Sequence, residues 1–248
     1  MKNIYNHILE NKKENRKLLA VLLDPYQCRG SLLASTIAAL KSNVPDFIFV
    51  GGSHILSSTD SLIELLKEET KAGVVLFPGN ASQFSTHADA LLYLSLFSGR
   101  NAEFLIGQHI TSAIAIKKSE IEVIPTGYLL IDGGKPSSVE YISNTRPIPH
   151  DKNEIALSTS VAAELLGMKL IYLEAGSGAN HPVSSEMIET VNSGLSIPLI
   201  VGGGIKNKAQ LKTAFEAGAD LVVVGNVFES DPALIADFVQ CKNGLNQE

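Results

Sequence analysis

Three consecutive glycines, Gly202, Gly203 and Gly204, are the residues of this 248-residue chain best suited to hold an anion. They follow a short apolar run and precede a segment with helical spacing, which predicts a strand, a loop of bare backbone and a helix. Such a loop lets the main chain approach a phosphate, and the first N–H groups of the helix point at it. A second apolar run ends soon afterwards in Gly225-Asn226. The pair of loops predicts a phosphate site, and plain tight turns are the alternative.

The segment from Tyr172 to Gly178 has residue types that suit acid–base chemistry. In an extended strand Tyr172 and Glu174 face one side and Leu173 the other, so a barrel would direct the tyrosine and the glutamate inward. A glutamate at a strand end is a candidate general base if its surroundings raise its pKa. The run ends in Gly176-Ser177-Gly178, a third turn rich in N–H groups. An ion pair between Glu174 and a lysine, beside ordinary turns, is the structural alternative.

Asp24 ends the first apolar run of the chain, and Pro25 blocks any extension of that strand. A carboxylate at the C-terminal end of a barrel strand points to the place where this fold has its chemistry. The alternative is that Asp24 only caps a helix or stabilises a turn.

Apolar runs alternate with helical segments along the chain, which predicts an α/β fold, a (β/α)8 barrel formed by one domain over residues 1–248. The expected strands are 17–23, 46–50, 73–77, 90–95, 122–132, 169–173, 197–201 and 220–224. Residues 78–89 are polar and show no helical stripe, so the third helix of the ring is expected to be missing or replaced by a non-helical segment. The apolar flank left open beside strands two to four is typical of an interface or a ligand groove. Residues 133–153 are expected to form a long loop.

The composition excludes several functions. A formal net charge of −6 argues against nucleic acid as a partner, because phosphate backbones are bound by clustered Lys and Arg. The two cysteines, Cys28 and Cys241, are too far apart in sequence to indicate a zinc site or a disulfide framework. No run approaches the roughly 18 apolar residues of a membrane span, and the N-terminus has no apolar signal core. These features predict a reduced, cytoplasmic setting.

Taken together, these loops resemble those of the geranylgeranylglyceryl phosphate synthases and their heptaprenylglyceryl phosphate synthase relatives. The resemblance extends from about residue 18 to the last helical segment of the chain. Its most specific part is the Tyr172 to Gly178 run together with Asp24-Pro25 and Gly51-Gly52-Ser53. The other matching residues are Phe77-Pro78-Gly79, Gly202-Gly203-Gly204-Ile205 and Gly225-Asn226. Tyr26-Gln27 departs from the family, which often has a charged residue after the Asp-Pro pair.

The resemblance implies a prenyl transfer in which the free primary hydroxyl of sn-glycerol 1-phosphate attacks C1 of a long prenyl diphosphate, most simply geranylgeranyl diphosphate. Diphosphate leaves and an ether forms. Because negative charge builds on the leaving group, the reaction calls for Mg²⁺ held by oxygen ligands. By the same resemblance Asp24 and Ser53 are the metal ligands, and Glu174 is the base that accepts the hydroxyl proton.

The resemblance also assigns the two substrate sites. The glycerol phosphate site would consist of Tyr172, Leu173, Glu174, Ala175, Gly176, Ser177, Gly178, Gly203, Gly204, Gly225 and Asn226. The prenyl tail would follow the open flank, with Phe77, Leu94, Phe97 and Phe104 as candidate lining residues. Packing in the core is the alternative for each of these four. His54 and His109 are expected to be structural or exposed.

Other interpretations stay open. One is a different phosphate-binding barrel enzyme, an isomerase or aldolase that acts on a sugar phosphate, although the sequence shows no strand-end lysine for a Schiff base. Another is a non-catalytic protein that binds prenyl lipid or glycerol phosphate. The apolar helices near the end of the chain predict a homodimer or an assembly of dimers. A lipid product would also bring transient contact with a membrane.

Overall fold

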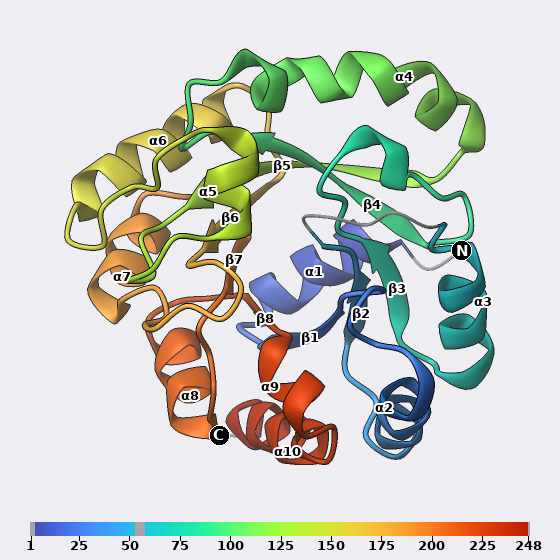
Figure 1. Ribbon diagram of the computed structural model, residues 1–248. Helices are drawn as coiled ribbons and strands as arrows, with labels where there is room; N and C mark the ends of the chain where they lie inside the picture. The colour runs from blue at the N-terminus through green and yellow to red at the C-terminus, as the bar shows by residue number, and fades with distance from the viewer. Residues whose placement is uncertain (1–2, 53–57, 248) are drawn as a thin grey trace.

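The computed structural model describes residues 3–52 and 58–247. Within these residues eight parallel strands pair in chain order, and β8 pairs with β1, so the barrel is closed as the sequence predicts (Figure 1). The strands are β1 (Leu18–Leu23), β2 (Phe47–Val50), β3 (Gly73–Leu76), β4 (Ala90–Leu96), β5 (Glu122–Leu130), β6 (Leu170–Glu174), β7 (Leu199–Gly202) and β8 (Leu221–Val224).

Helices surround the barrel (Figure 1). Those after β1 and β2 are α2 (Gly30–Ser42) and α3 (Asp60–Glu69), and β4 is followed by η2 (Glu103–Gly107, a π-helix) and α4 (Gln108–Ser119). The second half has α5 (Ser138–Ser143), α6 (Asn153–Leu165), α7 (Ser185–Ser193), α8 (Lys208–Glu216), α9 (Asn226–Ser230) and α10 (Leu234–Leu245). Polar side chains begin several of them: Ser184 accepts the N–H of Met187, and Asn207 accepts the N–H of Gln210. None of the described helices is long and apolar enough to cross a bilayer.

The strands separate two apolar cores. Alternate residues point into the barrel or outward to the helices, as β6 shows: Leu170 and Tyr172 lie in the inner core, whereas Ile171 and Leu173 lie in the outer one. The expectation that Tyr172 faces inward and Leu173 outward is therefore confirmed.

The connection between β3 and β4 has no α-helix among its residues, all of which the structure describes. One short 3-10 turn, η1 (Ala81–Gln83), takes the place of the helix that follows other strands. The predicted gap in the ring of helices is therefore present.

One expectation about the chain needs correction. Residues 133–153 contain helix α5 and are not a loop throughout, and Ile131 pairs with Ile148. Ser137 accepts the N–H of Glu140 at 3.1 Å, which is the serine and glutamate spacing of a helix start. The surrounding Gly, Pro and Ser residues obscured this signal. Figure 1 shows α5 near the open mouth of the barrel.

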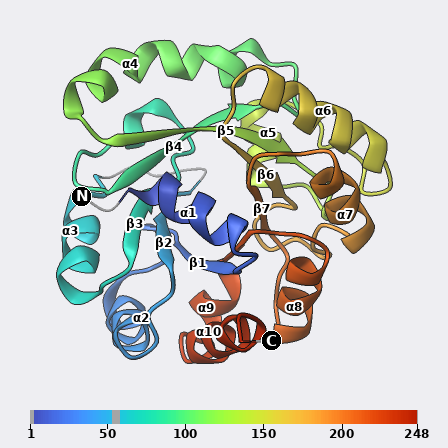
Figure 2. The same cartoon turned by 180° about the vertical axis from the view of Figure 1, so that it is seen from behind.

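The opposite end of the barrel is closed by α1 (Ile4–Lys13), which crosses it in Figure 2. Ile4 and Ile8 fill the inner core from below. Glu122, the first residue of β5, accepts the N–H groups of Ile4 at 2.7 Å and Tyr5 at 2.9 Å. The helix therefore begins on a carboxylate, which its N-terminal dipole favours.

Three aspartates hold the N-terminal ends of the strands together. Asp46, Asp89 and Asp220 each precede a strand and accept an N–H from the neighbouring strand, at Leu19, Val74 and Leu199, all at 2.8 Å. Each also pairs with a lysine: Lys242 with Asp46, Lys67 with Asp89 and Lys12 with Asp220. This end of the fold is thus fixed by satisfied charges, which is typical of its role in stability.

The aspartate rim can be tested at Asp220. Asp220→Ala leaves the buried N–H of Leu199 without its acceptor and Lys12 without its partner. We expect the free energy of unfolding to fall by about 2 kcal/mol, because an unpaired buried donor is costly. Asp237 is the matched control, since it faces Lys208 at 3.6 Å on the surface. Asp237→Ala should cost less than about 1 kcal/mol. Denaturant unfolding measures both, and equal losses would contradict the role given to the rim.

Candidate active site

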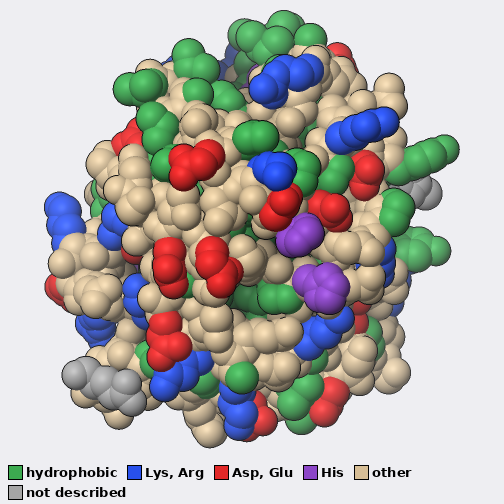
Figure 3. All heavy atoms as spheres, turned by 90° about the vertical axis from the view of Figure 1, so that its left-hand side faces the viewer, with side chains coloured by type: hydrophobic (Ala, Val, Ile, Leu, Met, Phe, Trp, Pro, Cys, Tyr) green, Lys and Arg blue, Asp and Glu red, His purple; other side chains and the backbone are tan. Residues whose placement is uncertain are grey.

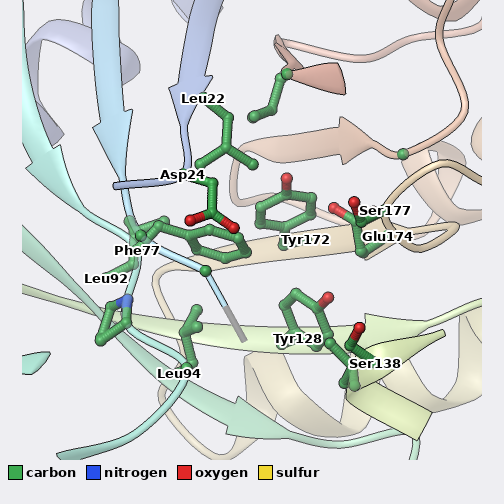
Figure 4. Close-up of a pocket in the computed structure, with 18 of the residues that line it drawn as sticks. Leu22, Asp24, Phe77, Leu92, Leu94, Tyr128, Ser138, Tyr172, Glu174 and Ser177 are labelled. Carbon is green, nitrogen blue, oxygen red and sulfur yellow. The ribbon is translucent and has the colours of Figure 1, made fainter. Parts of the chain in front are cut away.

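A cavity of about 500 Å³ opens at the C-terminal ends of the strands. Figure 4 shows side chains from several strands converging on it, with Leu92 and Leu94 on one side and Glu174 and Ser177 on the other. Part of its lining comes from Phe84, in the connection between β3 and β4, and from Ile116 on α4. The missing helix therefore lets the cavity extend beyond the mouth of the barrel.

Glu174, the last residue of β6, is a buried carboxylate in this cavity. It is 6% exposed, and no ion pair holds it within the described part of the chain. Its Oε1 accepts the N–H of Gly176 at 2.8 Å. Burial raises the pKa of Glu174, although the Gly176 N–H and Tyr172 act in the opposite direction. A carboxyl group whose pKa is raised in a cleft is suited to accept a proton.

Tyr172 lies beside Glu174 inside the barrel. Its Oη is close enough to the carboxylate for the two groups to interact, and burial raises the pKa of Tyr172 strongly. No group in the described ranges, however, gives this buried hydroxyl a hydrogen bond of normal geometry. An unpaired buried hydroxyl is costly, so it is a candidate to bind a substrate oxygen.

The two glycines after β7 lie where no other side chain would fit. Gly203 has φ +81°, and a Cβ there would overlap Oε1 of Glu174. Gly204 has φ +72°, and a Cβ there would lie 2.8 Å from the carbonyl oxygen of His181. Both positions therefore exclude a side chain, which brings bare backbone to the wall of the cavity beside Glu174.

The loops after β6 and β8 are joined by Asn226. Its Oδ1 accepts the N–H of Gly178 at 2.8 Å and the hydroxyl of Ser177 at 3.1 Å. Ser177, Gly178, Gly225 and Asn226 all line the cavity. The structure thus brings the turn after β6 to the same cavity as the two glycine loops, after β7 and β8, on which the sequence prediction of a phosphate site was based.

Two lysines lie near these loops and were not among the predicted site residues. Lys206 lines the cavity and donates to the carbonyl of Asn180 at 3.4 Å. Nζ of Lys135 lies 3.0 Å from the position of a Cβ on Gly178. Their charges make this side of the cavity suited to an anion. The position of Lys206 directly after the glycine loop was a sequence signal that could have identified it as a site residue. No feature of the sequence identified Lys135.

Carboxylates lie on the side of the cavity nearest β1. Asp24 lines it, and its Oδ1 accepts the N–H of Tyr26 at 2.8 Å. No residue within the described ranges donates a hydrogen bond to Oδ2, which makes this oxygen a candidate ligand for a cation. Glu229, which sequence analysis missed, also lines the cavity, and burial together with the charge of Asp24 raises its pKa. Ser53, the other predicted metal ligand, lies outside the described residues. The described residues contain no cluster of three His, Cys, Asp or Glu side chains for a metal.

Aromatic rings form the floor between these two sides. Phe77 stacks on Tyr172 with ring centroids 5.3 Å apart, and Tyr128 lies 5.4 Å from Tyr172 and 6.1 Å from Phe77. Figure 4 shows Asp24 above this group. Faces of aromatic rings attract cations, so the group suits a positive charge that develops in the reaction.

Three of the four candidates for a prenyl groove line the cavity: Phe77, Leu94 and Phe104. Phe97 does not, and this expectation needs correction. Phe97 lies just after the end of β4 and packs against the outer core. The groove instead has further residues that the sequence did not single out: Ala81, Phe84, Leu91, Leu92, Tyr93, Gln108, Ser112 and Ile116.

His109 lies in the same part of the cavity and packs edge-on against Tyr93, with ring centroids 4.4 Å apart. Burial lowers its pKa, which favours the neutral ring in an apolar groove. His54 lies outside the described residues.

Three predicted residues of the glycerol phosphate site do not line the cavity. Leu173 and Ala175 pack in the outer core, because they alternate with Tyr172 and Glu174. Gly176 acts through its N–H, which Glu174 accepts. Tyr172, Glu174, Ser177, Gly178, Gly203, Gly204, Gly225 and Asn226 are brought together around one space.

Known proteins are similar to this chain in sequence and in architecture. A sequence model of the PcrB family matches residues 11–242. The geranylgeranylglyceryl phosphate synthase of Chitinophaga pinensis is 48% identical over 94% of this chain and 93% of its own length. The synthase of the same name from Korarchaeum cryptofilum is 39% identical over 94% and 96%.

Solved structures agree. The (S)-3-O-geranylgeranylglyceryl phosphate synthase from Thermoplasma acidophilum, solved with its substrate sn-glycerol-1-phosphate, superposes with a TM-score of 0.90 at 32% identity, covering 98% of this chain and all of its own. Orotidine 5'-phosphate decarboxylase from Pyrococcus horikoshii, at 20% identity and a TM-score of 0.59, shares the fold alone. The chain therefore belongs to the PcrB family and is, like the synthases that it resembles over almost its whole length, a transferase enzyme.

Proposed function

We propose that this enzyme joins the free primary hydroxyl of sn-glycerol 1-phosphate to C1 of a long-chain prenyl diphosphate and releases diphosphate. The observation that carries the proposal is the division of one cavity into three parts. An apolar groove lies along β4 and α4, carboxylates lie near Asp24, and a buried base lies among glycine loops beside Lys206. The three parts match a prenyl tail, a diphosphate held through a cation, and a small phosphate ester. The solved relative with sn-glycerol-1-phosphate supports the last assignment.

The phosphate of the glycerol substrate is assigned to the loops after β6, β7 and β8. Their backbone can approach it closely at Gly203 and Gly204, and Lys206 adds a positive charge. The free hydroxyl of the substrate then lies near Tyr172 and Glu174. The Oη of Tyr172 lies beside the Glu174 carboxylate without a hydrogen bond of normal geometry among the described residues, so it is available to bind a substrate oxygen.

Glu174 accepts a proton when the new ether bond forms in this scheme. As the bond between C1 and the diphosphate oxygen breaks, the hydroxyl oxygen of the glycerol substrate bonds to C1, and its proton passes to the Glu174 carboxylate. The faces of Phe77 and Tyr128 are near enough to Tyr172 to surround an allylic centre that carries positive charge. The buried position of Glu174 and the absence of a cation partner in the described structure leave it ready to take the proton.

Asp24 would hold Mg²⁺ in this scheme. Mg²⁺ in enzyme sites uses one or two carboxylates with waters and substrate phosphates, so one uncommitted carboxylate oxygen beside the cavity suits it. When bound, the ion neutralises the charge that develops on the leaving diphosphate. Glu229 adds a second negative charge on the same side.

A turnover assay tests the proposed reaction. Labelled sn-glycerol 1-phosphate is incubated with Mg²⁺ and prenyl diphosphates of increasing length, with sn-glycerol 3-phosphate as the control substrate. We expect label in the organic extract only with the 1-phosphate, and the preferred donor reports the depth of the groove. Folded protein that yields no product with any donor would contradict the proposal.

Glu174→Gln tests the base. Glutamine can still accept the N–H of Gly176, but it cannot take a proton, so we expect kcat to fall at least about 100-fold while sn-glycerol 1-phosphate still binds. The ionised form is the active one, and burial raises the pKa of Glu174. The wild-type kcat should therefore fall, as pH is lowered, at a higher pH than an exposed glutamate would give. A variant with wild-type turnover would rule out this role.

We also propose that the protein assembles with copies of itself through α4. The C-terminal helices, on which the expected dimer was based, bury their apolar residues: Leu211, Phe215, Phe238 and Val239 all belong to the outer core. Exposed apolar side chains occur instead on η2 and α4, where Ile106, Ile110 and Ile114 are 60%, 71% and 69% exposed at a spacing of four residues. Figure 3 shows hydrophobic side chains gathered along the upper edge, where α4 lies. Such a patch is typical of an interface.

Ile110→Glu should disrupt this assembly, because it places a charge in the centre of the stripe. The molar mass in solution, measured by light scattering after gel filtration, is expected to fall to that of one chain. Leu165 on α6 is a matched control, since it is also exposed, and Leu165→Glu should leave the mass unchanged. A wild-type protein that is already monomeric would refute the interface.

A further inference from the structure

The side chain of Asn226 has a role that its place in a glycine motif does not predict. Its Oδ1 accepts two hydrogen bonds from the loop after β6, from the N–H of Gly178 and the hydroxyl of Ser177. Because a backbone N–H can only donate, the amide oxygen must face Gly178, which leaves the amide nitrogen on the other side. That nitrogen donates to Oε2 of Glu229 at 3.1 Å. The orientation of the amide is therefore fixed from both sides.

Glu229 is well placed to hold Asn226 and poorly placed to bind the glycerol substrate. It lies three residues further along α9 and is half-buried at the edge of the cavity. Its carboxylate would repel a phosphate, whereas it is a good acceptor for the amide of Asn226. The N–H of Gly178 and the hydroxyl of Ser177, in contrast, belong to the loop assigned to the phosphate.

The loop that Asn226 holds needs an external tie. Gly176 has φ +96° and Gly178 has φ +64°, and glycines have more backbone freedom to lose than any other residue. Hydrogen bonds that fix such a loop before the ligand arrives remove part of the entropy cost of binding. Asn226 provides two of these bonds from the end of β8, which is separated from β6 by β7.

We propose that Glu229 and Asn226 form a positioning pair in which Glu229 orients the Asn226 amide and Asn226 holds the Ser177-Gly178 loop in the shape that binds the phosphate of the glycerol substrate. The inference rests on the proposed function, since it assigns that loop to sn-glycerol 1-phosphate. It adds Glu229 to the residues that determine the affinity for sn-glycerol 1-phosphate. Because Glu229 also lies on the side of the cavity assigned to the diphosphate, the affinity for sn-glycerol 1-phosphate measured without donor or metal is the readout that isolates the pair.

The test compares Glu229→Ala, Glu229→Gln and Asn226→Ala with the wild type. Steady-state kinetics give kcat and a separate KM for each substrate, and calorimetry gives the affinity for sn-glycerol 1-phosphate without donor or metal. A hydrogen bond contributes about 1 kcal/mol net, so Glu229→Ala should raise the KM for sn-glycerol 1-phosphate about 5-fold. Asn226→Ala, which removes two bonds to the loop, should raise it more than about 10-fold. The calorimetric affinity should fall in parallel.

Glu229→Gln is the decisive variant. The glutamine oxygen still accepts from the Asn226 amide, so this variant should recover most of the affinity lost in Glu229→Ala. Glu154→Ala on the exposed start of α6 is the control for loss of a surface carboxylate, and it should leave the affinity for sn-glycerol 1-phosphate unchanged.

Two outcomes would overturn the positioning pair. One is a Glu229→Ala enzyme with an unchanged KM for sn-glycerol 1-phosphate. The other is equal loss in Glu229→Gln and Glu229→Ala, because the negative charge and not the hydrogen bond would then be responsible. A wild-type enzyme without turnover would contradict the proposed function instead, so the two failures are distinguishable.

Discussion

Closure of the parallel barrel is the constraint on which the rest of the structure depends. Every strand is hydrogen-bonded on both sides within the described residues, so its side chains must alternate between the interior and the ring of helices. This alternation places Tyr172 and Glu174 on the same side and moves Leu173 away from it. The inward position of the tyrosine and the carboxylate is thus decided by residue parity along β6.

Carboxylates at the two ends of the barrel have opposite environments. At the N-terminal end Asp46, Asp89 and Asp220 accept backbone N–H groups and pair with lysines, so their charges are satisfied. At the C-terminal end Glu174 is buried with no cationic partner among residues 3–52 and 58–247, and burial of such a charge costs free energy that an apolar residue would not. Fixed charges at one end stabilise the strands that hold the unpaired carboxylate at the other. Such a separation of stability and function is typical of this fold.

The absence of a helix after β3 also shapes the site. A helix at this position would bury the outer face of β3 and β4 and close the ring. With only the turn η1 there, Phe84, Leu91 and Ile116 line a cavity that continues from the mouth of the barrel. An apolar substrate tail that occupied this space would replace part of the packing that the helix does not provide. The gap therefore lengthens the site without opening the barrel itself.

The sequence by itself determined the strands, the missing helix and the glycine loops, because local hydrophobic periodicity and backbone requirements are properties of short segments. It also indicated Glu174 and Asp24, since both end apolar runs. Only the tertiary structure decided the residues that approach from elsewhere: Glu229 and the outer face of β4 line the cavity, and Lys135 reaches the turn at Gly178, through packing between distant segments. Helix α5 was hidden by its loop-like composition. The orientation of the Asn226 amide depends on the loop after β6, and the burial of Glu174 depends on the surrounding strands. Both are set by residues far away in the chain, which no local pattern encodes.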